Sequence, residues 1–328
     1  MREPTYAEAL RASWRLAWKH KDLWVFGLFA MMLGQFGIVD LLVRVGITVR
    51  TGGLTGWWEW CRLMFSPRAW QLVGQSLNLA VDGWVWFVWL AVLLTGLALA
   101  AVYVAVVSQG ALVYAAAKYA GRLSVFPDDR TSWHRGVSHF WRLLSLNVLR
   151  KVLFGLVALT VMAAGLSLAA EPSAWDRISF LLVFILAVLA GLIFSFLLVY
   201  AAGYVVVEER SFGEAVVASW RLFVRHWLVS IEVGLMVLAA NVVFLLIALA
   251  GVVYVFFLPV LAAKWLAAWS GSYLLFQAGV FFGYVLFIVF MLFIGSVFTV
   301  FTTSVWTYLF TKMHQTGLAS RLTHWLRR

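Results

Sequence analysis

Charged side chains are scarce in this chain, and their scarcity decides the class of protein. Only 12% of the 328 residues are Asp, Glu, Lys or Arg, whereas 64% are hydrophobic. A soluble globular protein carries about 25% charged residues. The stretches 181–207 and 280–310 contain no charged residue, and each is longer than the roughly 20 residues that a helix needs to cross a bilayer. These patterns exclude a soluble globular domain and predict an all-α polytopic membrane protein.

Cysteine and the known catalytic motifs are also missing. The single cysteine, Cys61, excludes an intramolecular disulfide and gives no sign of a cysteine-based metal site. None of the six histidines falls inside a long apolar run, so none is available as a general base within the membrane. The chain contains no Gly-x-Ser-x-Gly, no Walker-type glycine-rich loop and no His-Glu-x-x-His. We therefore expect no enzymatic activity, no cofactor and no bound metal.

Six stretches are long and apolar enough to be spanning helices: 23–47, 84–117, 148–169, 178–207, 228–256 and 279–311. About twenty amphipathic residues precede the first stretch and no small-residue cleavage pattern follows it, so we expect this span to stay as an anchor. An even number of spans puts both termini on one side of the membrane. Nineteen of the 25 Lys and Arg residues lie on that side, which predicts cytoplasmic termini.

A thirteen-residue segment occurs twice in the sequence. "EALRASWRLAWKH" at residues 8–20 and "EAVVASWRLFVRH" at residues 214–226 agree at eight positions, and each directly precedes a predicted span. A third copy is expected before the span at 148. There, "HFWRLLSLN" at residues 139–147 places Trp141, Arg142 and Leu143 in register with the Trp-Arg-Leu triplets of the other copies. Internal repetition of this kind predicts a repeated structural unit.

The repeat divides one membrane domain into three units, at residues 1–121, 122–210 and 211–328. Each unit is expected to contain an amphipathic interfacial helix followed by a helical hairpin of two spans. The third unit ends in a short basic tail. Two further segments, 50–83 and 258–277, are rich in tryptophan and are expected to lie in the outer interface as aromatic belts.

Helical geometry indicates what the repeated segment does. In the first copy Tyr6, Leu10, Trp14 and Trp18 recur every four residues and form an apolar stripe beside a cationic one. Such a helix lies in the headgroup plane and attracts anionic lipid. We predict lipid headgroup contacts at one Trp-Arg pair in each copy: Trp14, Arg15, Trp141, Arg142, Trp220 and Arg221. Alternatively, these side chains pack beneath the bundle as a cytoplasmic collar.

The segments "EALRASWRL" and "EAVVASWRL", each leading directly into a span, are typical of one bacterial family. The chain resembles the integral-membrane domain that is fused to some glycerophosphoryl diester phosphodiesterases and also occurs alone in bacterial membrane proteins. The resemblance covers the helix-plus-hairpin layout, hence most of the chain, and implies a lipid-associated role in the cytoplasmic membrane. Fused members carry a catalytic TIM-type barrel, but only seventeen residues follow the last predicted span, too few for a barrel.

Two polar patterns between the second and third spans have alternative interpretations. The tripeptide His-Arg-Gly at residues 134–136 matches the start of the catalytic signature of those barrels, but no Glu-Asn pair follows it. We interpret this match as a coincidence. Asp128, Asp129, His134 and His139 offer carboxylate and imidazole ligands without the tight spacing of a metal site, and we interpret them as solvated loop polarity.

Polar side chains inside the predicted spans are costly in lipid and therefore mark candidate sites. Glu232 enters the fifth span about one turn deep, and Asn241 lies on the opposite side of the same helix. Glu232 is expected to pair with a nearby basic side chain: Arg150, Lys151, Arg225 or His226. A proton or cation site at Glu232 is the alternative.

Other polar residues in the spans are expected to have structural roles. Asp40 and Arg44 are four residues apart near the outer end of the first span, a spacing that favours a local ion pair. Gln109, Ser108 and Asn147 are expected to join helices through hydrogen bonds.

Three classes of function remain. We favour a non-enzymatic, lipid-engaged scaffold or accessory subunit, whose partners are anionic membrane lipids and either another membrane protein or a second copy of the chain. A transporter or flippase-like carrier of lipid or amphipathic cargo is the alternative, because of the internal repeats and Glu232. An intramembrane enzyme has the least support. The net charge of +11 and the 19 tryptophans fit membrane topology and interfacial anchoring, and no nucleic acid partner is expected.

Overall fold

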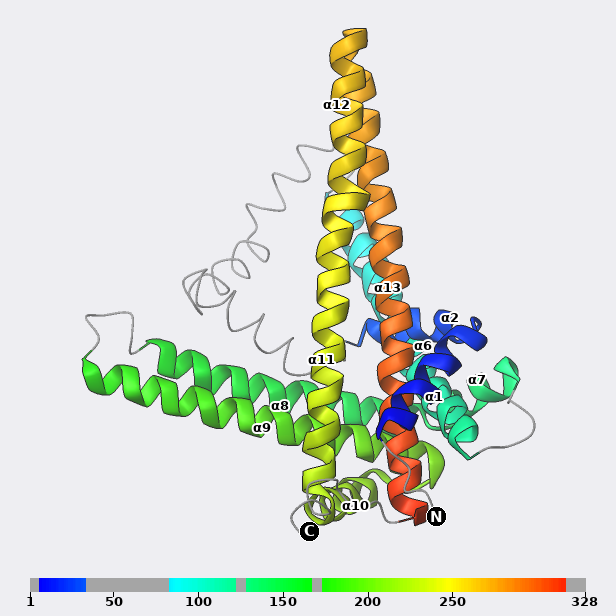
Figure 1. Cartoon of the computed structure of the whole chain (residues 1–328), viewed down its shortest axis with the longest axis vertical. Coiled ribbons are helices and arrows are strands. Elements are labelled where there is room, and N and C mark those ends of the chain that lie inside the picture. Colours follow the sequence, from blue (N-terminus) through cyan, green and yellow to red (C-terminus); the bar gives the residue numbers. More distant parts are fainter. Residues whose placement is uncertain (1–5, 34–82, 122–127, 167–172, 317–328) are drawn as a thin grey trace. The chain divides into compact units, whose positions relative to one another are not determined.

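A computed structural model describes residues 6–33, 83–121, 128–166 and 173–316 (Figure 1). All regular secondary structure in these ranges is helical, which confirms the all-α class. The helices are α1 (Tyr6–Lys19), α2 (Leu23–Met31), α6 (Gly83–Ala120), α7 (Asp129–Ser138), α8 (Phe140–Leu166), α9 (Ala174–Val207), α10 (Phe212–Arg225), α11 (Trp227–Gly251), the π-helix η1 (Val252–Phe257), α12 (Leu258–Ser270) and α13 (Tyr273–Thr316).

Five helical stretches are long and apolar enough to cross a membrane: Val88–Ala120, Phe140–Gly165, Ala174–Val207, Trp227–Ser270 and Tyr273–Met313. Each of the last five predicted spans falls on one of them. The first predicted span begins with α2, and its remainder lies outside the described residues. The chain is therefore a multi-pass membrane protein.

The predicted outer segment at 258–277 is not a separate element in the structure. Helix α11 continues through η1 into α12, and α13 runs back beside them (Figure 1). Proline usually interrupts a helix because its ring clashes with the carbonyl four residues earlier. Here Pro259 is the second residue of α12 and follows the π-helical turns of η1, where the regular i to i−4 hydrogen bonding of the α-helix is already interrupted. The stretch ends instead at Gly271, whose φ of 65° is readily adopted by glycine.

The described helices contribute to two compact units. One comprises Met1–Leu33, Ala105–Leu143 and Val199–Arg328, and the other comprises Gly34–Val104 and Leu144–Leu198. The first unit thus combines parts of all three predicted repeat units. It contains the short helices α1, α7 and α10. The three-unit division from the sequence stays a prediction.

The core of the first unit is built where α1 and α2 pack on α6 and α13. Its buried side chains are Leu16, Ala17, Leu23, Phe26, Ala111, Leu112, Ala115, Ala116 and Val300. Alanines dominate the α6 contribution, so the helix backbones approach closely, as is typical of membrane bundles. The Ser296 hydroxyl donates a hydrogen bond to the Trp24 carbonyl oxygen, which joins α13 to the first turn of α2.

The second unit contains the hairpin of α8 and α9, whose helices run side by side (Figure 1). Val157, Val161 and Ala187 are buried between them, and Phe154, Phe180 and Phe184 pack around this contact. Many aliphatic side chains on the outer faces of the two helices are exposed, among them Val152, Leu156, Leu182 and Leu186. An exposed aliphatic surface along a long helix is typical of a protein surrounded by lipid.

Candidate functional site

Helix α1 has three faces, and only one of them docks fully on the protein. Its buried face consists of small and aliphatic side chains: Ala9, Ser13, Leu16 and Ala17. The aromatic face is about half exposed, since Trp14 and Trp18 keep 47% and 42% of their surface accessible. Arg11, Arg15 and Lys19 are exposed. The aromatic stripe predicted from the sequence is therefore an outward face, and a separate small-residue face holds the helix in place.

Helix α10 repeats this arrangement. Its buried residues are Ala215, Ala218, Ser219 and Leu222, whereas Trp220 keeps 52% of its surface accessible. Arg221 and Arg225 are exposed. The helix begins with a capping box in which Ser211 and Glu214 bond reciprocally. These hydrogen bonds from Ser211 lower the pKa of Glu214. The negative charge of Glu214 then stabilises the N-terminus of α10.

The cations of both helices are available to an external ligand. No ion pair joins Arg15, Arg221 or Arg225 to any residue in the part of the chain that the structure describes. An exposed cation beside an exposed tryptophan matches a membrane interface, where the ring sits at the headgroup level and the cation meets lipid phosphate.

The Trp14 and Trp18 rings also contact the protein, as the alternative of a cytoplasmic collar would require. The ring centroid of Trp14 lies 5.9 Å from that of Phe301, and that of Trp18 lies 5.5 Å from that of Trp24, both edge to face. One edge of each indole thus contacts the bundle while much of its surface faces outward. The protein therefore fixes the orientation of these rings at its surface.

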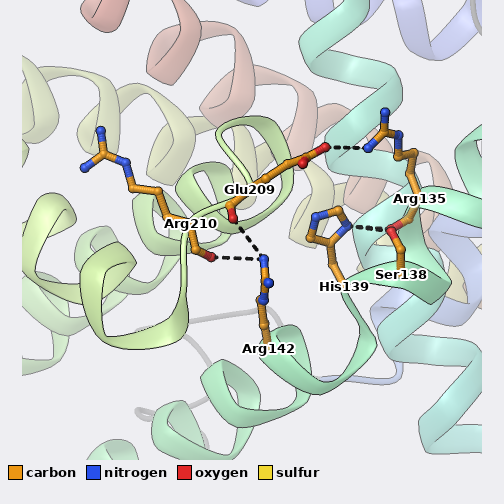
Figure 2. A network of polar contacts seen from close by, with 6 residues as sticks. All are labelled: Arg135, Ser138, His139, Arg142, Glu209 and Arg210. Carbon is orange, nitrogen blue, oxygen red and sulfur yellow. Dashed lines mark hydrogen bonds and ion pairs between the residues drawn. The ribbon is translucent and has the colours of Figure 1, made fainter.

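The predicted middle pair, Trp141 and Arg142, lies elsewhere. Both residues are in the first turn of the spanning helix α8, not on a separate interfacial helix. Figure 2 shows the Arg142 guanidinium pointing at the turn between α9 and α10, where it donates to the carbonyl oxygens of Glu209 at 2.9 Å and Arg210 at 3.4 Å. The Glu209 carboxylate pairs with Arg135 of α7. Arg142 therefore binds the chain itself, as in the collar alternative, although the sequence did not indicate which carbonyl oxygens it would bind.

The histidines that follow α1, α7 and α10 offer a second alignment for the predicted middle copy. A buried serine lies seven residues before each histidine, and a tryptophan lies six residues before it: Ser13, Trp14 and His20; Ser132, Trp133 and His139; Ser219, Trp220 and His226. This Ser-Trp-x5-His spacing is present in the sequence. The Trp-Arg-Leu triplet at residues 141–143 favoured a different alignment. Trp133 stacks on Phe26 with a centroid distance of 6.3 Å, so the middle tryptophan packs inward.

Replacing Arg142 by Ala is expected to loosen the α9–α10 turn. The change removes the donor to two carbonyl oxygens, a loss of about 1–2 kcal/mol, at a turn where Glu209 has a φ of 56° that is unfavourable for a side chain. Amide hydrogen exchange over residues 208–214 in nanodiscs should accelerate roughly 5- to 30-fold. Trp141→Ala alters the neighbouring exposed ring and should leave exchange unchanged. Equal acceleration in both variants would contradict the role assigned to Arg142.

The residues of the two alternative polar patterns are engaged within the fold. Asp128 caps α7 by accepting from the Asp129 amide at 2.9 Å, and the His139 Nδ1 lies 2.8 Å from the Arg135 carbonyl oxygen. Gly136 packs directly against the backbone of Val107. Within the described ranges, no three His, Cys, Asp or Glu residues converge as a metal site would require. These residues therefore shape and position α7.

A small electrostatic cluster connects the start of α7 with the turn between α1 and α2. Burial raises the pKa of Asp129, and the neighbouring Asp22 and Asp128 raise it further. Burial lowers the pKa of His20, assisted by Lys19 and opposed by Asp22 and Asp129. Partial burial thus favours the neutral form of both groups, although their mutual attraction opposes it.

Glu232 in α11 is partly buried, and its carboxylate is shielded. Neither carboxylate oxygen has a hydrogen-bond partner among the described residues, and each exposes less than 1 Å². Arg225 and His226, the predicted partners in the same unit, form no ion pair with Glu232 among the described residues. Arg150 and Lys151 belong to the second unit, so pairing with either of them stays a prediction. Two residues away, the Ser230 hydroxyl lies 2.8 Å from that of Tyr200 and is satisfied. Glu232 is thus a shielded carboxylate without a partner.

The remaining predicted polar residues do not join Glu232 in one site. Asn241 is partly buried farther along α11, and Gln109 is partly buried in α6 with a polar contact of its own. Ser108 and Asn147 are buried. The Ser108 hydroxyl has no hydrogen-bond partner among the described residues, so the predicted hydrogen bond between helices is not formed there. Asp40 and Arg44 lie outside the described residues.

The geometry leaves two candidate features: the exposed Trp and Arg faces of α1 and α10, and the shielded carboxylate of Glu232. Neither contains a set of groups that would perform covalent chemistry within the described structure. Comparison with known proteins adds no assignment to these features. No family model matches the chain, and neither a curated protein nor a solved structure is significantly similar to it.

Proposed function

We propose that this chain is a non-enzymatic, multi-pass protein of the bacterial cytoplasmic membrane that acts as a lipid-engaged scaffold or accessory subunit. The observation that carries the proposal is the pair of docked helices, α1 and α10, whose tryptophans and cations face outward. Each helix is held by a small-residue face, so its aromatic and cationic faces remain free for lipid. A helix held this way anchors the bundle at the headgroup plane.

The expected strength of this engagement follows from the charges. Each Lys or Arg near an anionic membrane surface contributes about 1 kcal/mol, and neither Arg221 nor Arg225 is neutralised by an ion pair with a described residue. The exposed indole of Trp220 adds an amphipathic ring that favours the interface. Two such helices on one chain bind a lipid surface more firmly than one, because the second engages without a new loss of translational freedom.

The location and family are parts of the same proposal. The excess of Lys and Arg on the side of the termini supports a cytoplasmic location for both ends. Membership in the integral-membrane domain family related to the phosphodiesterases is supported by "EALRASWRL" and "EAVVASWRL". The recurring Ser-Trp-x5-His spacing supports a threefold repeat whose middle copy ends at His139. The large exposed apolar surface of the helices offers room for a partner protein or a second copy within the membrane.

A carrier of lipid or amphipathic cargo is the second candidate. Glu232 supports it, because an intramembrane carboxylate without a partner is typical of sites that bind a proton or a substrate. The scaffold remains the preferred function, because the outward Trp and Arg faces occur on two helices whereas the carboxylate is a single residue.

The double variant Arg221→Gln and Arg225→Gln tests lipid engagement. Losing two cations is expected to weaken retention of anionic lipid by about 2 kcal/mol, or roughly 30-fold. We would reconstitute the protein in nanodiscs of phosphatidylglycerol and phosphatidylcholine, release it gently, and count retained lipids by native mass spectrometry.

The matched control is Arg177→Gln with Lys264→Gln, which removes the same charge from the side predicted to face outward. This control should keep most of its anionic lipid. Equal loss in both double variants would mean that net charge, not α10, retains the lipid, and the proposal would fail. A protein that copurifies in stoichiometric amount with the wild type and is lost with the α10 variant would identify the chain as an accessory subunit.

A further inference from the structure

The orientation of Glu232 is the feature that the proposed function leaves unexplained. The residue as a whole is partly exposed, yet both carboxylate oxygens are shielded and have no hydrogen-bond partner among the described residues. The charged end therefore points into the protein while part of the apolar stem faces outward. Long charged side chains near a membrane surface normally do the reverse and extend their charged ends toward water.

The helix itself does not stabilise this carboxylate. Glu232 is the sixth residue of α11, beyond the first turn whose amide groups lack partners within a helix. The residues one turn away on either side, Leu228 and Met236, are apolar. Arg225 and His226 precede it on the chain without pairing with it. A buried carboxylate without donors is costly, so the site is built for a donor supplied from outside the protein.

The surroundings favour one class of donor. An inorganic cation such as Mg²⁺ or Ca²⁺ needs about six oxygen ligands, but the described residues gather no group of three or more His, Cys, Asp or Glu side chains around Glu232. The hydroxyl of Ser230 is already bonded to Tyr200. A primary ammonium group carries its own three donors and one positive charge, so a single carboxylate is sufficient to bind it.

The position of Glu232 makes lipid the source of this group. The residue lies five positions after Trp227, about 7.5 Å along the helix, which is within reach of a headgroup at the interface. The neighbouring Ile231 and Leu235 keep 40% and 66% of their surface accessible, and Glu232 itself is partly exposed, so a rotation of its side chain would bring the shielded carboxylate to a lipid-facing surface. We propose that Glu232 binds the primary ammonium group of a phospholipid headgroup. This inference rests on the proposed lipid engagement but uses a different residue and the opposite charge.

The experiment compares lipid retention by the wild type and Glu232→Gln, a change that keeps the side-chain size and removes the charge. Nanodiscs contain equal amounts of phosphatidylethanolamine, with a primary ammonium, phosphatidylcholine, with a quaternary one, and anionic phosphatidylglycerol. The wild type should retain phosphatidylethanolamine preferentially on release into native mass spectrometry. Glu232→Gln should lower this preference about 10- to 100-fold, the usual range for a hydrogen bond to a charged group. Retention of phosphatidylglycerol should not change.

Two controls keep the proposal falsifiable. Glu214→Gln removes the same charge from the neighbouring helix and should leave the phosphatidylethanolamine preference intact. If Glu232→Gln does not fold, Glu232→Asp keeps the charge, draws it back by one methylene and should retain part of the preference. Because the Arg221 and Arg225 variants change phosphatidylglycerol retention, failure of the proposed function is distinguishable from failure of this inference.

Two further measurements distinguish a lipid ammonium group from a free amine and from a proton as the ligand of Glu232. Free ethanolamine, added to discs without phosphatidylethanolamine, should bind more weakly than the lipid; tighter binding of the free amine would support the ammonium chemistry and overturn the lipid source. Infrared spectra of wild-type discs should lack a protonated carboxylic acid band that disappears in Glu232→Gln. Such a band, together with unchanged phosphatidylethanolamine retention in Glu232→Gln, would show that Glu232 merely holds a proton and would overturn the proposal.

Discussion

Gly136→Ala is expected to destabilise the first unit by about 3 kcal/mol, although alanine is the better helix former by about 1 kcal/mol. An added Cβ would lie 2.2 Å from the Val107 carbonyl oxygen and 3.0 Å from its carbonyl carbon. Because the obstacle is backbone, no rotamer change relieves it, and α7 must move away from α6. Overpacking of this kind costs 1–3 kcal/mol and sometimes more. The free energy of unfolding in micelles measures the effect.

The control for this prediction is Gly155→Ala in α8, where an added Cβ has no neighbouring atom within 4 Å. This variant should be unchanged or more stable, by up to about 1 kcal/mol. If Gly136→Ala is as stable as Gly155→Ala, the close crossing of α6 and α7 is not as described here. The comparison also tests the interpretation of the His-Arg-Gly tripeptide, because its glycine then has a packing role.

Trp24→Ala is expected to cost about 3–5 kcal/mol, the range for removing a large aromatic side chain from a core. The Trp24 ring lies edge to face with Trp18 at 5.5 Å and with Phe293 at 5.1 Å between centroids. Its Nε1–H also donates to the Ala17 carbonyl oxygen at 2.7 Å, near the end of α1 where carbonyl groups lack helical partners. Unfolding in micelles should reveal the loss, and proteolysis should cleave the α1–α2 turn faster.

Trp24→Phe separates packing from hydrogen bonding. Phenylalanine keeps an aromatic ring but loses the indole donor, so we expect a smaller cost of about 1–2 kcal/mol. Trp265→Ala, which removes a ring that is 69% exposed on α12, should cost less than about 1 kcal/mol. A loss in Trp24→Phe as large as in Trp24→Ala would mean that the hydrogen bond, and not the aromatic contacts, holds α1 and α2 on α13.

Pattern alone was sufficient to locate most of the helices, although not α7. The amphipathic helices α1 and α10 lie where the "EALRASWRLAWKH" and "EAVVASWRLFVRH" segments predicted them, and the last five predicted spans coincide with long apolar helices. Both predictions rest on properties of contiguous residues, namely a 3.6-residue period and an uninterrupted apolar run. The continuation of α11 through Pro259 was missed, because whether proline ends a helix depends on the turn before it, here the π-helix η1.

Candidate sites were harder to predict because they depend on residues far apart in the chain. Arg142 follows a tryptophan at a predicted interface, and its local context indicated a lipid contact. The carbonyl oxygens that it binds belong to residues 67 and 68 positions later. Glu232 had four basic candidates as partners, and the two in its own unit, Arg225 and His226, do not pair with its carboxylate.

Hydrophobic content and periodicity along the chain were sufficient to predict the membrane class, the five described spanning helices and the amphipathic character of α1 and α10. Which face of each helix docks became clear from the packing: the small residues around Ser13 and Ser219 are buried, while Trp14 and Trp220 remain about half exposed. The physical reason is that close packing selects side chains by size and fit against a partner surface, and that surface is formed by distant segments of the chain.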